Sequence, residues 1–231
     1  MSGLTVEELQ KEHTAKTLLP WAYDWVNRLP VTMIRLRQGL AKPLIEEALP
    51  LGIFAMHHFN SSEDVTLSLV LGNQNYDALV KDERKNPSPF NYIEVTQAHE
   101  GEGQYLRMLE LEKKGFVSAH GAMHKTGSKA KGINVDAVGI AVSPEVILYQ
   151  ELDRIEAAVK RKIGKKYPEA TALVIVFDDY SLQRYEENKK KNIEKLERRL
   201  NLLLPSLEGF VWFSAVGWSR KTFVEYDLTC K

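Results

Sequence analysis

The sequence contains a single cysteine, Cys230, next to the last residue of the 231-residue chain. One thiol cannot form a disulfide within the chain, which is typical of proteins that work in a reducing cytoplasm. The last residues of a domain are usually poorly ordered, so we do not expect Cys230 to act as a catalytic nucleophile. We therefore expect a cytoplasmic protein without disulfide bonds.

Long apolar runs and a net charge are also missing. The apolar runs fall far short of the roughly 20 residues that a membrane-spanning helix needs. The first residues, MSGLTVEELQKEHTAK, lack the basic and apolar segments of a secretory signal. Because 31 basic residues balance 31 acidic ones, attraction to nucleic acid would have to come from local patches. We expect no membrane partner.

The composition is that of an ordinary globular protein, with 44% hydrophobic and 27% charged residues. No linker, low-complexity segment or internal repeat divides the chain, so we expect one domain over residues 1–231. The expected order is helix, three or four strands, helix, strand, helix, strand, helix and two strands. This order predicts an α/β domain with a mixed central sheet flanked by helices.

In the first half, apolar spacing predicts a helix over residues 33–49, kinked at Pro43. The segment GIFAMHHFN that follows is interpreted as a strand. A later helix is expected to end at Gly115. Residues 116–122 are then expected to form a strand, followed by a flexible basic loop.

In the second half, Ser143-Pro144-Glu145 predicts the start of a helix that runs to about residue 163, with serine as the N-cap and proline in the first turn. The nearly continuous apolar run ALVIVFD predicts a central strand buried on both faces. A charged helix over residues 182–203 and two final strands complete the predicted sheet.

Two carboxylates stand on neighbouring predicted strands in the first half. Asp77 opens the strand at residues 78–80, and Glu94 interrupts the strand at residues 92–96. A charge on an interior strand costs several kcal/mol unless it is paired or binds a cation. Neighbouring strands lie about 4.8 Å apart, so the two groups could share Mg²⁺. Alternatively, Asp77 caps a turn and Glu94 faces solvent at a sheet edge.

The motif Tyr76-Asp77-Ala78-Leu79-Val80, followed on the next strand by Ile93-Glu94-Val95-Thr96, resembles the PD-(D/E)XK nuclease superfamily. In that family an aspartate begins one strand and Glu-x-Lys lies on the next. The resemblance covers about residues 33–122. It implies a restriction-endonuclease-like core there, with residues 143–231 extending the sheet and its helices.

The resemblance also implies roles for individual residues. Asp77 and Glu94 would be ligands of Mg²⁺ or Mn²⁺, and Glu46 or Glu47 would be an acid carried by the preceding helix. Gln104 and Tyr105 would be supporting polar groups. Thr96 stands where the family has lysine; its hydroxyl can hydrogen-bond a water, but it brings no positive charge to a phosphate.

The basic segment HKTGSKAKG offers a possible substitute for the missing charge. Lys125, Lys129 and Lys131 could provide a lysine to the site, or follow a nucleic-acid backbone and release its counterions. A solvated surface loop is the alternative interpretation of this segment.

The sequence holds two further groups of polar residues. His57 and His58, on a strand, would point to opposite faces, so they could not bind one zinc ion together. Asp178 and Asp179 follow the buried strand, at the end where open sheets place ligand sites. They could equally cap the next helix.

Together these features predict Mg²⁺-dependent hydrolysis of phosphodiester bonds, in DNA rather than RNA, by a catalytic set of Asp77, Glu94, Thr96 and Glu47. The alternative is a nuclease-fold protein without activity that binds nucleic acid or a protein partner, for example in phage or host defence. An unrelated α/β enzyme and a homodimer also stay open.

Overall fold

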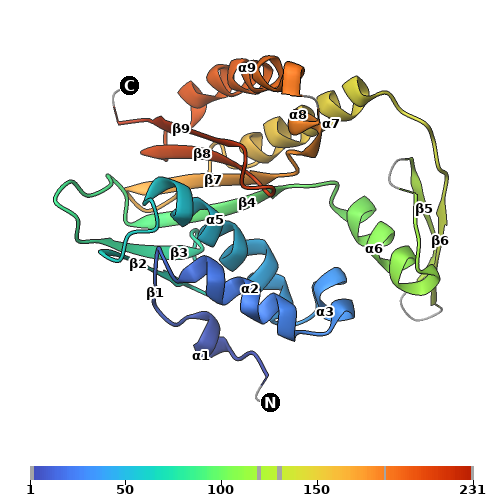
Figure 1. Ribbon diagram of the computed structural model, residues 1–231, viewed down its shortest axis with the longest axis horizontal. Coiled ribbons are helices and arrows are strands. Elements are labelled where there is room, and N and C mark those ends of the chain that lie inside the picture. Colours follow the sequence, from blue (N-terminus) through green and yellow to red (C-terminus); the bar gives the residue numbers. More distant parts are fainter. Residues whose placement is uncertain (1–2, 119–120, 129–131, 185, 230–231) are drawn as a thin grey trace.

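Strand β7 (Thr171–Phe177) is buried at every residue and lies inside a seven-stranded sheet (Figure 1). The computed structural model describes residues 3–118, 121–128, 132–184 and 186–229. Alternate β7 side chains enter two hydrophobic cores, one on each face of the sheet. One core receives Ala172, Val174 and Val176, and the other receives Leu173, Ile175 and Phe177. Burial on both faces explains the continuous apolar run.

The sheet is mixed and its strand order is β1-β2-β3-β4-β7-β8-β9. The pairs β4–β7 and β7–β8 are parallel, and the other neighbours are antiparallel. The expected α/β domain with a mixed sheet between helices is confirmed. The remaining strands of the sheet are β1 (His13–Thr14), β2 (Val65–Leu69), β3 (Ala78–Asp82), β4 (Tyr92–Ala98), β8 (Trp212–Gly217) and β9 (Phe223–Asp227).

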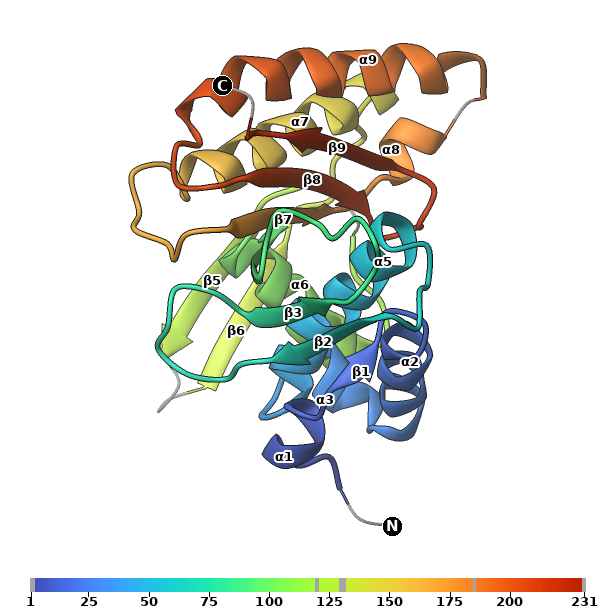
Figure 2. The same cartoon turned by 90° about the vertical axis from the view of Figure 1, so that its left-hand side faces the viewer.

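Helices cover both faces of the sheet, as Figures 1 and 2 show. One core lies under α2 (Leu18–Arg28), η1 (Leu44–Ala48) and α5 (Leu49–His58). The other lies under α7 (Pro144–Lys160), α8 (Tyr180–Gln183) and α9 (Glu186–Leu203). The shorter elements are α1 (Val6–Leu9), α3 (Val31–Arg35), α4 (Ala41–Pro43) and η2 (Leu204–Ser206). No helix in the described ranges is long and apolar enough to cross a membrane.

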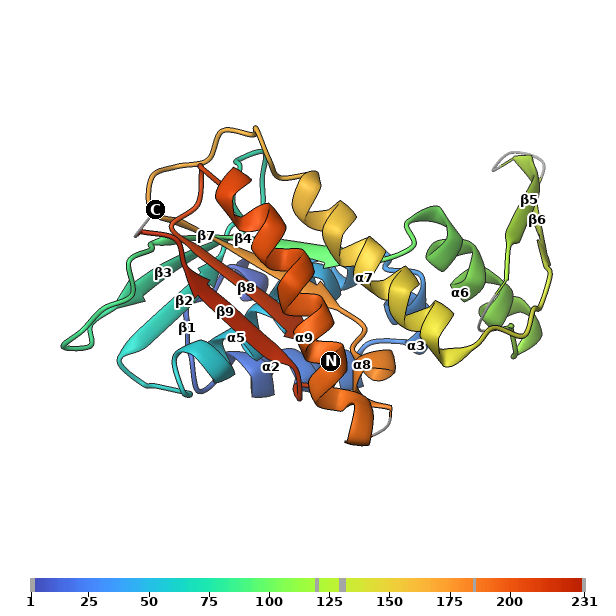
Figure 3. The ribbon, with the colours of Figure 1, turned by 90° about the horizontal axis from the view of Figure 1, so that it is seen from above.

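An arm projects from one end of the sheet (Figure 3). It consists of α6 (Glu102–Lys114) and the hairpin of β5 (Met123–Ser128) and β6 (Gly132–Ala137). Buried Arg107 of α6 ties the arm together by donating to the carbonyls of Ser118 and Gly121 at 2.6 and 3.2 Å. The same guanidinium pairs with Glu100 at 3.1 Å, at the base of the arm.

Two predictions for the first half were wrong. Residues 33–49 do not form one helix, and GIFAMHHFN belongs to α5 rather than to a strand. Most of α5 is buried, and a short, fully apolar run has no periodicity that separates a buried helix from a buried strand. His57 and His58 are therefore neighbours on a helix.

The prediction for residues 116–122 was also wrong, because the described residues of this range lie outside any strand. The described residues of the basic segment after it are not a free loop: residues 124–128 belong to β5, and Gly132 begins β6. Lys129, Lys131 and Cys230 lie outside the described residues. Helix α7 is confirmed, with the Ser143 hydroxyl accepting from the Val146 amide, and the helix predicted over 182–203 is divided into α8 and α9.

Candidate active site

The two carboxylates singled out by the sequence lie close together at the β3–β4 junction. The antiparallel register of β3 and β4 ends with Ala78 opposite Ile93, so Asp77 and Glu94 are the residues next to this last pair. The Asp77 amide donates to the Ile93 carbonyl at 2.8 Å, and the Asp77 carboxylate accepts from the Val95 amide at 2.7 Å. Asp77 therefore contacts β4 through both its backbone and its side chain.

Beyond this point the edge of β4 is open. Strand β3 pairs with β4 through only two residue pairs, whereas β7 pairs with β4 along all of Tyr92–Ala98. A cavity of about 230 Å³ fills the space that β3 leaves. Its lining residues are Glu46, Glu47, Asp77, Val95, Thr96, Gln97, His99, Arg161 and Lys162.

A π-helical turn brings the helix-borne acids to this cavity. Pro50 has no amide hydrogen to bond the Glu46 carbonyl four residues earlier, and its ring would clash with that carbonyl in a regular helix. The helix widens just before it, so that the Leu49 amide donates to the Leu44 carbonyl. Glu46 then pairs with Arg37 at 2.7 Å, while Glu47 is free of that pair and lines the cavity.

Negative charge accumulates at the candidate site, which is partly buried. Burial, together with Asp77, raises the pKa of Glu47 to about 8. Burial and the neighbouring Glu94 raise the pKa of Asp77 to about 7, against the opposing effects of the Val95 amide and Lys162. Carboxylates perturbed in this way are typical of catalytic and metal sites.

Lys162 is the residue that the sequence prediction missed. Its ammonium group forms an ion pair with the Glu94 carboxylate, and both side chains are largely buried. Lys162 lies just after the C-terminal end of α7, the helix that connects the arm to β7. The segment KRKIGKK that contains it is visibly basic, but only the parallel return of the chain to β7 brings Lys162 to β4.

Thr96 and Gln97 complete the wall along β4. The Thr96 hydroxyl is buried and has no hydrogen-bond partner among the described residues. Gln97 is fixed by two contacts: it accepts from Arg37 at 2.9 Å and donates to the Ile45 carbonyl at 3.0 Å. Of the predicted catalytic set, Asp77, Thr96 and Glu47 line this cavity, and Glu94 lies beside it through its ion pair with Lys162.

Other predicted residues lie elsewhere. Gln104 is on α6 and lines a second cavity, and Tyr105 is 41% exposed on the same helix. Lys125 is on the arm, where it pairs with Glu102 at 2.8 Å. His58 bridges Glu225 and Ser88 at 2.7 and 2.8 Å, away from the candidate site.

The candidate site offers oxygen donors to a divalent cation. Within the described residues no three histidine, cysteine or carboxylate side chains form a preformed metal cage. Mg²⁺ usually needs only one or two carboxylates, with waters and substrate phosphate as its other ligands. Two carboxylates with raised pKa values and the unpartnered Thr96 hydroxyl fit such an ion.

No family model, curated protein or solved structure matches the chain.

The raised pKa values predict how stability depends on pH. In the folded state Glu47 and Asp77 keep protons up to pH values near 8 and 7, whereas the unfolded chain releases them near pH 4. The folded state thus binds more protons in between, so the free energy of unfolding should decrease as pH rises from 5 to 8.5.

This prediction is checked by thermal unfolding in EDTA across that pH range. In Glu47→Gln the decrease should be smaller, because Glu47 is the carboxyl group with the highest of the raised pKa values and no longer titrates. Glu187→Gln, which removes an exposed carboxylate from α9, is the matched control and should behave like the wild type. An identical decrease in Glu47→Gln would show that Glu47 does not carry the effect.

Proposed function

We propose that the protein is a PD-(D/E)XK-type, Mg²⁺-dependent phosphodiesterase acting on nucleic acid. The observation that carries this proposal is the proximity of Asp77 and Glu94 where β3 leaves β4, with the Lys162 ammonium on Glu94. A divalent cation site beside a fixed positive charge suits a phosphate group, whose negative charge increases during hydrolysis.

The topology supports the same proposal. Helix α5 is followed by three antiparallel strands, β2, β3 and β4. Helices α6 and α7 then connect β4 to β7, which is parallel to β4. The family core is a helix, strands, a helix and a strand; the resemblance placed it in residues 33–122, whereas the order found here runs from α5 to β7. This order uses β7 as the final strand, because the strand expected at residues 116–122 is absent from its described residues.

Each residue of the site has a defined task in this proposal. Asp77 and Glu94 would hold the metal, and Glu47 would add a ligand from the helix. The bound ion would polarise a phosphoryl oxygen and lower the pKa of a bound water. Lys162 would balance charge on the phosphate, as the family lysine does, from a helix end instead of from β4. The Thr96 hydroxyl is suited to orient a water by hydrogen bonding.

Lys125, Lys129 and Lys131 belong to the proposal as contacts to the phosphate backbone, with DNA as the favoured substrate. Lys125 is exposed on the projecting arm, where a duplex or single strand could approach it. Contacts of this kind give affinity without sequence preference and weaken as salt rises.

A non-catalytic nucleic-acid-binding protein is the second candidate, and one observation favours it. The Glu94–Lys162 ion pair already neutralises one of the two metal ligands. If no metal ion displaces Lys162 from Glu94, the cavity would only provide polar contacts within a nucleic-acid-binding surface.

The first test of activity uses plasmid DNA and RNA with Mg²⁺ or Mn²⁺. Cleavage by the wild type should stop in EDTA, and Asp77→Asn and Glu94→Gln should each lower it roughly 100-fold or more. Glu83→Gln, which removes an exposed carboxylate just after β3, is the control and should cleave normally. Equal cleavage by all four proteins would point to another site, and no cleavage of either substrate would favour the binding protein.

The role of Lys162 has a separate test. Lys162→Ala should lower the rate about 100-fold by removing the charge beside the phosphate, while Lys160→Ala should have little effect. Lys160 lies two residues away, pairs with Glu156 and is exposed.

A second variant distinguishes catalysis from simple stability. The double variant Thr96→Lys/Lys162→Ala places a lysine at the family position, and it should recover part of the activity lost in Lys162→Ala. Unfolding curves of all variants must be measured alongside. Full activity in Lys162→Ala would exclude this lysine from the reaction.

A further inference from the structure

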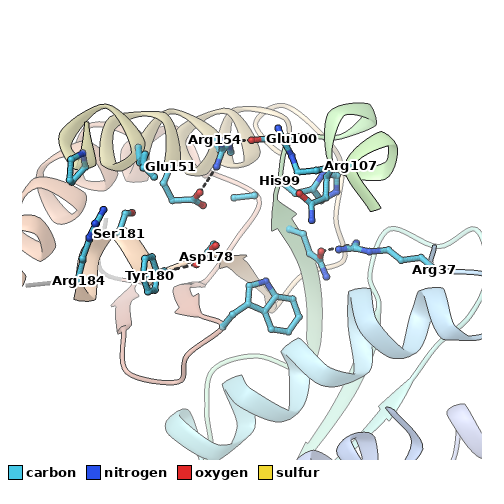
Figure 4. Close-up of a pocket in the computed structure, with 16 residues that line it drawn as sticks. Arg37, His99, Glu100, Arg107, Glu151, Arg154, Asp178, Tyr180, Ser181 and Arg184 are labelled. Carbon is cyan, nitrogen blue, oxygen red and sulfur yellow. Dashed lines mark hydrogen bonds and ion pairs between the residues drawn. The ribbon is translucent and has the colours of Figure 1, made fainter. Parts of the chain in front are cut away.

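A second and larger cavity, of about 550 Å³, lies past the carboxyl ends of β4 and β7, against α6, α7 and α8 (Figure 4). This volume is within the range of small-molecule sites. Gln97 and His99 line both this cavity and the candidate active site, so the two are adjacent. We call it the β4–β7 cavity. None of the catalytic roles proposed above uses it.

Glu151 of α7 is the unusual group in the β4–β7 cavity. Its side chain is only 4% exposed, and one carboxylate oxygen, Oε2, accepts from Arg154 at 2.6 Å. The other, Oε1, is buried and makes no hydrogen bond of good geometry within the described residues, although the backbone amide of Asp178 is close enough to the carboxylate to oppose the rise of its pKa. Figure 4 shows the carboxylate directed from α7 toward the side of the cavity where Asp178 lies. A buried acceptor left unpaired costs free energy, which a ligand N–H group would recover.

The charges around Glu151 indicate what kind of ligand fits. Four arginines and three carboxylates line the cavity, and Glu46, which is not in the lining, neutralises Arg37, so positive and negative groups balance there. A ligand with charge of only one sign is therefore disfavoured. The ligand should combine a negative group with N–H donors, as a nucleotide does. The lining charged residues are Arg37, Arg107, Arg154, Arg184, Glu100, Glu151 and Asp178.

An aromatic side chain is available for stacking. Tyr180 opens α8 at the rim of the cavity and is 67% exposed, although large aromatic rings are usually more buried. Its backbone amide donates to the Asp178 carboxylate at 2.9 Å, which holds the start of α8 in place (Figure 4). Exposed aromatic rings beside basic groups are typical stacking platforms for unpaired bases.

We propose that the β4–β7 cavity binds one unpaired, amino-bearing nucleobase of the strand held at the candidate active site, with the base amino group donating to Glu151 Oε1. This inference rests on the proposed function, because it takes the strand from that site. Cytosine fits: carboxylates accept from its N4 amino group. Thymine presents a carbonyl oxygen at the same position and would meet the carboxylate with two acceptors.

The test measures binding apart from cleavage. Fluorescently labelled oligo(dC) and oligo(dT) of ten nucleotides are titrated with the Asp77→Asn variant in Ca²⁺ at pH 8.5. Burial raises the pKa of Glu151 to about 7, so at this pH the carboxyl is ionised and only accepts. We expect oligo(dC) to bind roughly fivefold more tightly than oligo(dT) or better.

Two variants assign the preference to the cavity. Adding Glu151→Gln should bring the two affinities together, because an amide can donate to thymine as well as accept from cytosine. Adding Tyr180→Ala should weaken both oligonucleotides by a similar factor. Glu145→Gln, an exposed residue of the same helix, is the control and should keep the preference. Thermal unfolding confirms that each variant is folded.

The outcomes separate this inference from the proposed function. Equal binding of the two oligonucleotides, a preference that survives Glu151→Gln, or no binding by folded protein would each overturn the base-binding cavity, whatever the cleavage assay shows. A preference lost in Glu151→Gln, in a protein that cleaves nothing, would support the cavity and reject the nuclease. Free dCMP that binds while oligo(dC) fails to displace it would overturn the proposal that a strand supplies the base.

Discussion

The parallel pairing of β4 with β7 is the interaction on which the candidate site depends. Because β7 holds β4 along its full length, β3 can leave after two pairs without exposing a second edge of β4. The open edge becomes the cavity wall. A parallel connection also requires a crossover, here through the arm and α7, and this returns Lys162 to the face that carries Glu94. The β4–β7 pairing thus provides both the cavity and the ammonium group of Lys162.

Charge in the cavity is unbalanced in a way that a purely structural cluster would avoid. Asp77 and Glu94 raise the pKa of Glu47, and Glu94 raises the pKa of Asp77, yet within the described part of the chain only Lys162 forms an ion pair with any of the three. Protonation or a cation can relieve the repulsion. The distorted helix at Glu46 and Glu47 adds a further local cost, and such π-turns occur frequently at functional sites. The repulsion between the carboxylates and the distortion of the helix both lower stability, which is consistent with selection for binding rather than for stability.

The sequence predicted what depends on local pattern. The spacing of Asp77 and Glu94 on neighbouring strands, the buried run of β7 and the Ser143 cap of α7 were all visible in short stretches. The prediction from sequence failed where tertiary contacts determine the local structure. GIFAMHHFN is apolar enough for either a helix or a strand, and burial on α5 made it helical. Lys162 could not be found because it reaches Glu94 only through a long crossover. Thr96, two residues from Glu94, did mark the position where the positive charge of the family lysine was missing.

The two cavities are linked by Gln97, and this makes their chemistry interdependent. Arg37 holds Gln97 from one side and at the same time pairs with Glu46, the neighbour of Glu47. The Ile45 carbonyl holds Gln97 from the π-helical turn itself. A base bound beside Gln97 would therefore contact a side chain that is hydrogen-bonded to Arg37 and to the Ile45 carbonyl. The same hydrogen bonds help to position the π-helical turn that carries Glu47. Recognition at the β4–β7 cavity and alignment of the carboxylates would then be coupled through one side chain, without movement of the sheet.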